Sequence, residues 1–591
     1  MLPLPRPIRA LSIPAFSDRT VLLHDAAARH WLLFRAPTEI YVARSPAEVV
    51  RVLNTVQAQV TATGCYAAGF VAYEAAPGFD SALIARSPGE FPLAWFGIYP
   101  RPESFAWPDT RPANVPLLWE PSVDDCGYRD AIRRIAAYIA AGDTYQVNYS
   151  FRLRSPLTFA PWDLFQQAIA AQGAGYSAYV QLPDWTICSS SPELFWQRQG
   201  RSLSSRPMKG TIARGLWSQQ DRVRARWLQQ SEKNRAENVM IVDMVRNDFN
   251  RIADRGSVSV LGLFDLEQYP TLWQMTSTVD CTSDAGLAEV FRAVFPPASI
   301  VGAPKARTME IIAELEDSPR RIYTGSIGFV TRDRAQFNVA IRTVLVDRRA
   351  QTAEYGVGGG IVWDSSDRAE QEECHTKARV LSYVEPRFSL LETLLWTPRD
   401  GYFLLSLHLQ RLQDSAAYFA HALDATAIRQ NLECLGNRLP PHPHKVRLLV
   451  TKSGAVRLEH YLHQPAATTV RLQLAREPVD AGDRFLYHKT THRRIYDRAL
   501  AERGNCDDVL LWNRDGEATE TCYCNLVAEL DGQLVTPPLH CGLLAGTYRS
   551  WLLKQGKISE QAIAVADLKR CNRLFVINSV QQWRSAILIS E

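Results

Sequence analysis

Residues 355–384 read YGVGGGIVWDSSDRAEQEECHTKARVLSYV, a glycine run followed by an apolar stretch and then a helical pattern. The spacing predicts a helix over residues 368–384, in which Glu370, Glu373 and Lys377 share one face with apolar side chains. Charged side chains on an apolar face are expected to point inward, toward a polar site. From this helix alone, a solvent-exposed face with ion pairs is the more ordinary interpretation.

The glycine run before this helix is the second feature of the segment. Gly358, Gly359 and Gly360 offer successive backbone N–H groups that no side chain shields, which suits the binding of a carboxylate. A dinucleotide-binding loop is not favoured, because that motif needs a helix directly after its glycines. An apolar strand is predicted here instead, at residues 361–363.

A further helix is predicted over residues 231–252, with Ser231 as its N-terminal cap. Glu237 and Asp248 share one face of this helix with apolar neighbours. Carboxylates that point inward from two separate helices suit Mg²⁺, which prefers oxygen ligands and keeps positions open for water or substrate.

One lysine lies in a glycine-containing segment between these features. The sequence RPMKGT at residues 206–211 places Lys209 directly before Gly210. A tight turn is predicted there, where a backbone can approach a ligand closely.

Length and composition indicate a folded protein of at least two domains. The 591 residues are 46% hydrophobic and 22% charged, with a net charge of +4. No long charge run or long apolar stretch predicts a nucleic-acid or membrane partner. The proline-broken N-terminus does not resemble a signal peptide, and eleven cysteines without a C-x-x-C pair predict reduced thiols and a cytoplasmic location.

The chain is predicted to divide at a short linker. Residues 1–383 form the first predicted domain, with 1–120 as its N-terminal part, and residues 390–591 form the second after a linker at 384–389. Strands and helices in segregated blocks predict an α+β fold for the first domain, and short strands between Pro/Gly turns are predicted in its N-terminal part.

The start of the second domain shows a different pattern. Strands are predicted at residues 390–397 and 401–407, followed by a helix from His408 to about Leu423. Strands with Gly-rich turns follow.

Eight collinear segments of the first domain point to one enzyme family. They are GDTYQVN (142–148), SSSPELF (189–195), RPMKGT (206–211), RAENVMIVDMVRND (235–248), PPASIVGAPKARTMEII (296–312), YTGSIGF (323–329), NVAIRT (338–343) and GGGIVWDS…EQEECHTKA (358–378). Together they closely resemble the chorismate-utilising enzymes, which include aminodeoxychorismate, anthranilate and isochorismate synthases. The resemblance implies an anthranilate-synthase-like α+β domain, a β-sandwich with helices.

The resemblance also implies roles for individual residues. Glu237 and Glu373 would hold Mg²⁺, and Glu193 would be the general acid for the departing 4-hydroxyl of chorismate. The substrate carboxylates would be held by a larger set: Tyr323, Arg342, Lys377 and the backbone of Gly358, Gly359 and Gly360. Gln274 stands where some relatives carry His, which leaves its role in substrate binding open.

Two positions distinguish the family members. Isochorismate-type enzymes carry a lysine base where this chain has Gln146, so water is disfavoured as the nucleophile. Aminodeoxychorismate synthases carry a lysine where this chain has Lys209, and anthranilate synthases usually carry Ala. By the resemblance Lys209 attacks C2 of the ring, which requires the neutral amine. The alternative is a spectator that pairs with a substrate carboxylate.

The sequence shows no glutaminase motif. Ammonia is therefore expected from a glutamine amidotransferase subunit in trans.

The second domain resembles the fold-type IV pyridoxal-phosphate enzymes, which include amino-acid aminotransferases and aminodeoxychorismate lyase. The matching segments are LLETLL (390–395), HLQRLQDSAAYF (408–419), FLYHKTTHRRIYD (485–497), NRDGEATETCYCNLV (513–527), TPPLHCGLLAGTYR (536–549) and FVINSV (575–580). The resemblance implies a fold-type IV PLP-dependent α/β domain in which Lys489 attaches to pyridoxal 5′-phosphate. Glu520 would pair with the ring nitrogen, and Arg411, Gly546 and Thr547 would hold the phosphate.

Taken together, the two resemblances predict an enzyme of folate biosynthesis. It would make 4-amino-4-deoxychorismate from chorismate and ammonia, and then eliminate pyruvate to give 4-aminobenzoate. The alternatives are an anthranilate or isochorismate synthase joined to an aminotransferase, and a degenerate second domain, which is shorter than usual for its family. A homodimer through the PLP domain is also possible on this resemblance.

Overall fold

The computed structural model describes residues 16–108, 118–173, 175–378, 386–465 and 467–589. These residues fall into two compact units. The N-terminal unit runs to Ala213 and resumes at Ala225, and the C-terminal unit holds Arg214–Arg224 and the chain from Pro386 onward. Each unit is described by itself. No helix in the described ranges combines the length and apolar character needed to span a bilayer.

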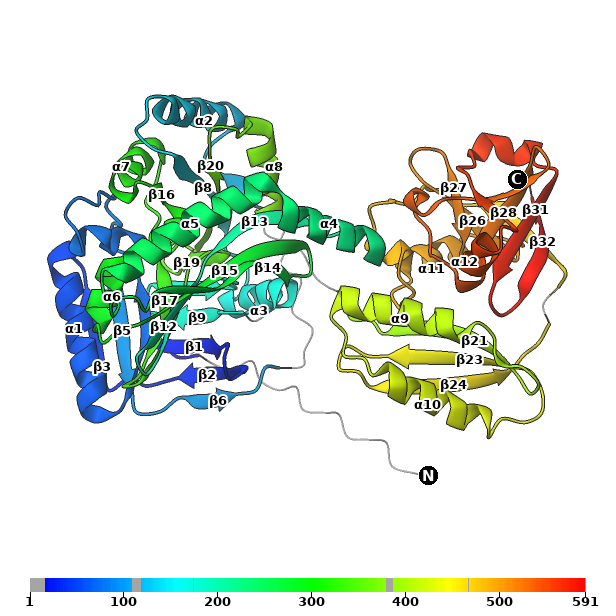
Figure 1. The fold of residues 1–591 in the computed structure, drawn as a ribbon, viewed down its shortest axis with the longest axis horizontal. Coiled ribbons are helices and arrows are strands. Elements are labelled where there is room, and N and C mark those ends of the chain that lie inside the picture. The colour runs from blue at the N-terminus through cyan, green and yellow to red at the C-terminus, as the bar shows by residue number, and fades with distance from the viewer. Residues whose placement is uncertain (1–15, 109–117, 174, 379–385, 466, 590–591) are drawn as a thin grey trace. The chain divides into compact units, whose positions relative to one another are not determined.

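Two large antiparallel sheets form the N-terminal unit (Figure 1). The first has the order β16 (Gly302–Ala303), β8 (Gln146–Pro156), β20 (Thr352–Ile361), β19 (Thr343–Asp347), β10 (Trp185–Ser189), β9 (Ala178–Gln181), β1 (Thr20–Asp25), β2 (His30–Phe34) and β6 (Glu103–Phe105), with β7 (Glu120–Pro121) beside β8. The second has the order β13 (Met208–Ala213), β15 (Leu272–Thr282), β12 (Ser202–Arg206), β11 (Leu194–Gln199), β18 (Arg334–Asn338), β17 (Ser326–Val330), β4 (Tyr66–Val71), β5 (Ala94–Tyr99) and β3 (Glu39–Ala43), with β14 (Ser259–Gln268) beside β15.

The central strands β4 and β5 are buried on both faces, which explains why they are almost continuously apolar. On β5, Trp95 and Tyr99 point into the core shared by the two sheets, whereas Phe96 and Ile98 point into a second core under the helices. Successive side chains of a strand alternate between faces, so a strand covered on both sides needs apolar residues throughout. The domain is the β-sandwich with helices that the sequence predicted.

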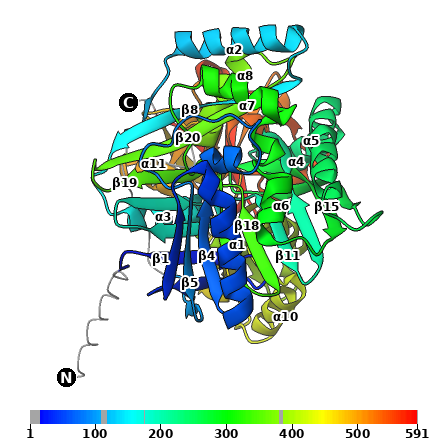
Figure 2. The ribbon, with the colours of Figure 1, turned by 90° about the vertical axis from the view of Figure 1, so that its left-hand side faces the viewer.

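Helices cover the outer faces of this sandwich. They are α1 (Pro46–Thr63), α2 (Asp125–Ala140), α3 (Pro161–Gln172), α5 (Glu232–Asn250), α6 (Leu287–Val294), α7 (Lys305–Leu315) and α8 (Asp367–Ala378). Figure 2 shows α1 lying along β4 and β5. The Ser231 cap predicted for α5 is confirmed, because its hydroxyl accepts a hydrogen bond from Asn234 N.

Helix α1 corrects the expectation of strands alone in residues 1–120. Its start is marked by Ser45, Pro46 and Glu48, whose carboxylate accepts from the Ser45 backbone N–H at 3.1 Å. Gly64 ends it with φ of 68°. The apolar positions of α1 are mostly valine, which favours strands by composition, although they recur with helical spacing.

The C-terminal unit contains two further sheets. The smaller has the order β22 (Gly401–Tyr402), β21 (Leu390–Thr397), β23 (His444–Val450) and β24 (Val456–Leu462), and packs with α9 (Leu405–Phe419) and α10 (Ala425–Gly436). The larger, mixed sheet has the order β27 (Ala518–Thr521), β26 (Asp508–Trp512), β25 (Thr469–Leu474), β32 (Gln582–Leu588), β31 (Arg573–Asn578), β28 (Asn525–Leu530), β29 (Gln533–Thr536) and β30 (Ser559–Glu560), with helices α11 (Arg494–Ala501) and α12 (Thr547–Lys554).

One predicted strand of this unit is wrong. Residues 401–407 were expected to be extended, but only Gly401–Tyr402 is a strand and α9 begins at Leu405. The apolar run there is too short for its period to separate strand from helix, and Leu405 and Leu407 lie in the first turn of α9.

A segment from the first half of the chain belongs to the C-terminal unit. Arg214 forms a buried bidentate ion pair with Asp221 and also donates to the Tyr418 carbonyl on α9 at 3.0 Å. The Tyr418 hydroxyl donates in turn to Gly215 O at 2.7 Å. Residues 214–224, with the first turns of α4 (Ser218–Gln230), are therefore held by reciprocal contacts with α9.

Aromatic packing under α6 provides a direct test of the N-terminal core. Phe291 is fully buried, with its ring centroid 5.4 Å from that of Trp196 and 5.1 Å from that of Phe337. Phe291→Ala is expected to lower the free energy of unfolding of this unit by about 3–5 kcal/mol, because a cavity replaces the ring. Urea unfolding followed by tryptophan fluorescence measures the change. The exposed Leu261→Ala is the control, with an expected change within about 0.5 kcal/mol, and equal effects would contradict the packing.

Candidate active sites

A cavity of about 290 Å³ in the N-terminal unit brings most of the predicted residues of the first domain together. Its walls come from β13, α5, β15, β20 and α8 and from the loops that carry Glu193, Tyr323 and Arg342. The predicted residues that line it are Glu193, Lys209, Glu237, Gln274, Tyr323, Arg342, Gly358, Gly360 and Lys377. These residues lie far apart in the sequence, so the fold alone makes them neighbours.

Gly359 and Glu373 belong to two elements that form walls of this cavity, β20 and α8. Gly359 lies on β20 beside the cavity residues, where an added Cβ would come within 3.1 Å of Glu370 Oε2. Glu373 falls on α8, but its side chain lies outside the described part of the structure. Glu370, which sequence reasoning placed on the same helix face without a role, is buried and lines the cavity.

The Lys209 segment is a strand rather than the predicted tight turn. Its pairing with β15 is interrupted between Met208 and Thr211, so Lys209 and Gly210 form a bulge, with φ of 91° at Gly210. A bulge re-aims a side chain without ending the strand, a possibility that the short motif did not reveal.

The glycines of β20 leave room for the Lys209 side chain, because they have no Cβ. A Cβ on Gly360 would lie 2.6 Å from Lys209 Nζ and 2.5 Å from Gln146 Nε2. Any other residue at position 360 would therefore displace both groups. Gly356 leaves room for the Tyr323 ring in the same way, since a Cβ at this position would lie 2.3 Å from the ring.

The three glycines predicted to offer backbone N–H groups lie on a strand. Residues 358–360 are part of β20 and pair with β8, from Ser150 to Asn148. The carbonyl of Gly358 accepts a hydrogen bond from Lys377 Nζ at 2.8 Å, so Lys377 is anchored to the strand. The close approach of side chains at Gly356 and Gly360 gives these glycines a further reason, and a carboxylate bound by the 358–360 backbone stays a prediction.

Gln274 holds the bulge that carries Lys209. Its Oε1 accepts from Thr211 Oγ1 at 3.0 Å, and its Nε2 donates to Gly210 O at 3.1 Å. The geometry gives this residue a positioning role, and a titratable side chain is not needed for these two bonds.

Glu193 is a buried acid at the cavity. Ser299 Oγ donates to its Oε1 at 2.8 Å. Burial raises the pKa of Glu193 to about 7, because the charged form loses hydration, while Ser299, Lys209 and Arg342 act in the opposite direction. Near neutral pH such a carboxyl group is available both as a proton donor and as a proton acceptor.

Gln146 lies beside these groups with an unused amide. Its side chain is fully buried, and neither Nε2 nor Oε1 has a hydrogen-bond partner among the described residues. A buried amide without partners is costly, and a polar group bound near Lys209 Nζ would reduce that cost.

In the C-terminal unit, the predicted cofactor residues gather around Lys489. Burial lowers the pKa of Lys489 to about 8, with a further contribution from Arg411, while the charge of Glu520 acts the other way. An amine with this pKa is partly neutral near neutral pH and can attack a carbonyl group.

Glu520 lies in a cage of donors that the sequence did not reveal. Tyr496 Oη and Leu544 N donate to its Oε1 at 2.8 and 3.1 Å, and Asn525 Nδ2 donates to Oε2 at 3.1 Å. Burial raises the pKa of Glu520 to about 7. A cationic partner, such as a protonated ring nitrogen, would favour the charged form.

Arg411 and Thr547 are joined by a buried network. Arg411 donates to both oxygens of Glu392, at 2.8 and 2.6 Å, and to Ala545 O at 3.1 Å. His408 bridges Glu392 and Thr547, with distances of 2.6 and 3.2 Å. Although burial acts to raise the pKa of Glu392, Arg411 and His408 lower it to about 2, so it is a fixed anion.

The phosphate position predicted at Gly546 and Thr547 fits the local structure. Gly546 caps α12, and a Cβ there would lie 1.9 Å from Asn525 Oδ1, so only glycine fits. The first N–H groups of a helix favour an anion. Together with Lys489 and the caged acid Glu520, this set of groups fits pyridoxal phosphate.

Comparison with known proteins finds one matching family model for each unit. A family model described as chorismate binding enzyme matches residues 18–383, more than half of the chain. The chain belongs to the chorismate-binding enzyme family. A second model, amino-transferase class IV, matches residues 389–589, and the resemblance predicted for each domain is confirmed at this level.

Curated relatives of this family carry two different activities in their names. Aminodeoxychorismate synthase component 1 of Salmonella typhimurium is 38% identical over 282 residues, which is 47% of this chain and 62% of the relative. Anthranilate synthase component 1 of Thermus thermophilus is 38% identical over 257 residues, 43% of this chain and 55% of the relative. The chain thus spans about three fifths of the length of these relatives, and overall identity does not separate the two names.

The solved structures support the fold. Anthranilate synthase component I from Streptococcus pneumoniae matches with a TM-score of 0.52 and 21% identity, over 65% of this chain and 95% of that chain. At this identity the match shows the chorismate-binding fold alone.

The raised pKa of the buried Glu193 predicts that this residue lowers the stability of the N-terminal unit at alkaline pH. Because its folded pKa is about 7 and its unfolded pKa near 4.5, its contribution to stability is lost as the pH rises through about 7. Glu193→Gln is therefore expected to raise the free energy of unfolding of the N-terminal unit at pH 8, by up to about 3 kcal/mol, with the gain shrinking toward pH 5. Urea unfolding at several pH values measures this. The exposed Glu232→Gln should show no such gain, and a pH-independent effect of Glu193→Gln would contradict the raised pKa.

Proposed function

We propose that this chain makes 4-aminobenzoate from chorismate and ammonia in two steps, one in each unit. The observation that carries the first step is the Lys209 amine, which lies against Gly360 in the same cavity as the buried acid Glu193. Curated relatives with either name are 38% identical to this chain, so overall identity does not separate aminodeoxychorismate from anthranilate synthesis. Lys209 supports aminodeoxychorismate synthesis, because the resemblance associates this lysine with amination at C4.

In the first step, Lys209 acts as the nucleophile and Glu193 acts as the general acid. Lys209 Nζ bonds to C2 of chorismate, the ring double bonds shift, and the C4–O bond breaks. Glu193 supplies the proton with which the 4-hydroxyl leaves as water, since hydroxide is a poor leaving group. Ammonia then bonds to C4 while Nζ leaves C2, which yields 4-amino-4-deoxychorismate and restores the free lysine.

The substrate carboxylates need cations and donors at fixed positions. Arg342 and Lys377 line the cavity, and Arg342 is further held by a hydrogen bond to Gln172. The unpartnered amide of Gln146 lies close enough to Lys209 Nζ to orient the incoming ammonia. As a neutral amide it cannot act as the base that would activate water.

Mg²⁺ fits the oxygen donors of this cavity. The carboxylates of Glu237 and Glu370 both line it, from α5 and α8, and Glu373 remains a predicted ligand. When bound, Mg²⁺ draws charge from a substrate carboxylate and fixes its orientation.

The second step is assigned to the C-terminal unit. Pyridoxal phosphate, when bound, supplies an electron sink. Lys489 would remove the proton from C4 of the aminated substrate, the C3–O bond breaks, and the enol of pyruvate leaves and is protonated at carbon. Glu520 would hold the ring nitrogen, and Arg411, Gly546 and Thr547 would hold the phosphate. The ring becomes aromatic, which drives the elimination.

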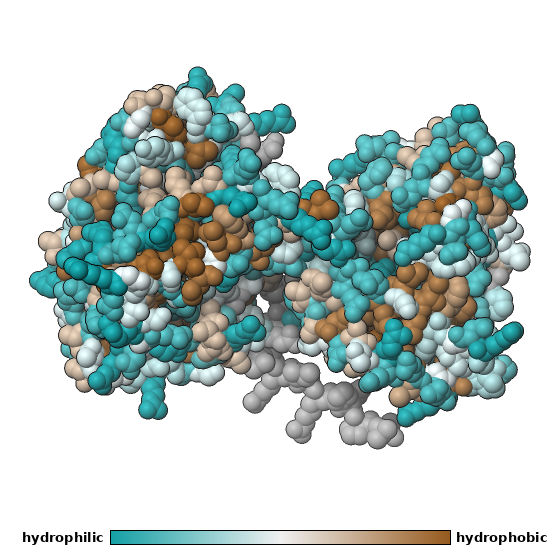
Figure 3. Space-filling view, in the orientation of Figure 1, coloured by the Kyte–Doolittle hydropathy of each residue, from teal (hydrophilic) through white to brown (hydrophobic). Residues whose placement is uncertain are grey.

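A glutamine amidotransferase in trans would supply the ammonia. The chain shows no glutaminase motif, and the relatives are named as component 1 of their enzymes. An apolar groove lined by Tyr145, Val239, Met240 and Phe264 lies on α5 and its neighbours, and Figure 3 shows apolar surface on this unit. Such a surface is available to a second subunit.

Product analysis tests the proposal directly. The full chain with chorismate, ammonium, Mg²⁺ and pyridoxal phosphate is expected to yield 4-aminobenzoate and pyruvate, measured by liquid chromatography and mass spectrometry. Lys209→Ala should reduce the para product at least 100-fold, because the nucleophile is lost. Lys489→Ala should accumulate 4-amino-4-deoxychorismate and lack the visible absorbance of lysine-bound pyridoxal phosphate.

The controls and alternatives are distinguishable. The exposed Lys554→Ala should leave both steps unchanged. Formation of 2-aminobenzoate or isochorismate would overturn the first assignment. Accumulation of the aminated intermediate by the unaltered chain would instead indicate a degenerate second domain and leave the first step standing.

A further inference from the structure

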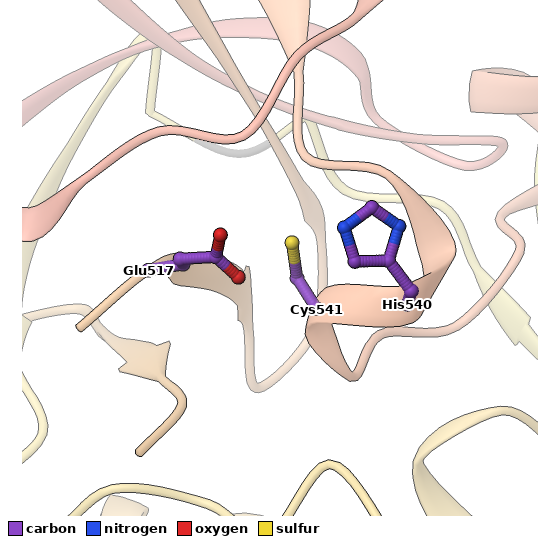
Figure 4. A group of neighbouring side chains, drawn as sticks. All are labelled: Glu517, His540 and Cys541. Atoms are coloured by element: carbon purple, nitrogen blue, oxygen red, sulfur yellow. The ribbon is translucent and has the colours of Figure 1, made fainter. Parts of the chain in front are cut away.

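Three side chains of the C-terminal unit meet outside the cofactor residues. A carboxylate oxygen of Glu517, a ring nitrogen of His540 and Sγ of Cys541 all lie within 4.8 Å of one another. Figure 4 shows the Cys541 sulfur between the Glu517 carboxylate and the His540 ring. Cys541 is fully buried, Glu517 is half-buried and His540 is exposed, so the group opens to solvent on the histidine side.

Asn513 fixes the two segments that carry this group. Its Nδ2 donates to Glu517 Oε2 at 2.9 Å and to Cys541 O at 3.1 Å. Its Oδ1 accepts from the Glu517 backbone N–H at 3.0 Å. An outer residue that orients ligand-bearing segments in this way is typical of metal sites, where it holds the ligands in place before the ion binds.

The backbone around Cys541 is also constrained. His540 and Cys541 lie on the 3₁₀ turn Leu539–Cys541, which Gly542 ends with φ of 101°. A side chain at position 542 would be strained in this conformation. The turn therefore presents two adjacent side chains toward one carboxylate.

We propose that Glu517, His540 and Cys541 bind a zinc ion, with water in the fourth position. Thiolate, imidazole and carboxylate together suit Zn²⁺, whereas Mg²⁺ and Ca²⁺ take oxygen ligands. On binding, the metal replaces the proton of the Cys541 thiol, and that proton leaves to solvent. Three protein ligands and an open side toward solvent match the coordination of a zinc ion that keeps one water.

The site lies at the start of the loop that builds the cofactor pocket. Three residues after Cys541, Leu544 N donates to Glu520 Oε1 at 3.1 Å, and Leu544 O accepts from Asn525 at 2.9 Å. Ala545 O accepts from Arg411 at 3.1 Å. Zinc would pin the beginning of this loop, so it should raise the melting temperature of the C-terminal unit, because it binds the folded state alone.

Zinc K-edge X-ray absorption of the full chain tests the site. The protein is prepared without an affinity tag, loaded with pyridoxal phosphate and kept in excess Mg²⁺, so that oxygen-ligand sites are filled. The expected result is one zinc per chain with one sulfur neighbour at about 2.3 Å. Equilibrium dialysis with Zn²⁺ gives the affinity on the same samples.

The variants separate this site from surface binding. Cys541→Ser should remove the sulfur neighbour, and His540→Gln should weaken zinc binding at least tenfold. Because His540 is exposed, its replacement should leave the fold intact. The His540→Gln result therefore stands even if replacing the buried Cys541 disturbs folding. Cys434→Ser, at an exposed cysteine, is the control and should change neither measurement. Zinc surrounded only by nitrogen and oxygen, or an affinity unchanged by His540→Gln, would overturn the proposal.

Discussion

The contact between Lys209 and Gly360 is the constraint on which the first site depends. The lysine Nζ lies only 2.6 Å from where a Cβ on Gly360 would be, and Gln146 Nε2 lies 2.5 Å from the same point. This contact needs a glycine on one sheet, a bulged strand on the other, and Gln274 to hold the bulge through Thr211 and Gly210. A change in any of these parts would move the amine. The β-sandwich therefore determines the position of Lys209 Nζ.

Burial shifts the pKa of ionisable groups at the candidate sites of both units. Glu193 and Glu520 each have a pKa raised to about 7 by burial, and Lys489 has one lowered to about 8. Each of these shifts costs stability near neutral pH, because the charged form is less well solvated in the fold than in the unfolded chain. Proteins accept such costs at sites where a proton must be given or taken at that pH.

The sequence predicted the family of each unit and most residues of the first cavity, because short motifs keep their order along the chain. It could not predict what depends on distant contacts. The bulge at Lys209 was expected to be a turn, since pairing with β15 is not visible in six residues. The donors around Glu520, Tyr496 among them, come from separate segments, and no spacing rule connects them. Helix α1 was missed although its cap residues were readable, because its valines favour strands by composition.

A covalent link between Lys209 and the substrate ring would distinguish a nucleophilic lysine from one that only pairs with a substrate carboxylate. Rapid acid quench of the full chain with chorismate and Mg²⁺ in the absence of ammonia, followed by proteolysis and mass spectrometry, measures it most directly. A nucleophilic Lys209 should give a peptide that contains Lys209 and carries the mass of chorismate less one water, and Glu193→Gln should give a much smaller yield of this peptide. Unmodified Lys209 under conditions in which chorismate is turned over, or the same adduct on another lysine, would contradict it.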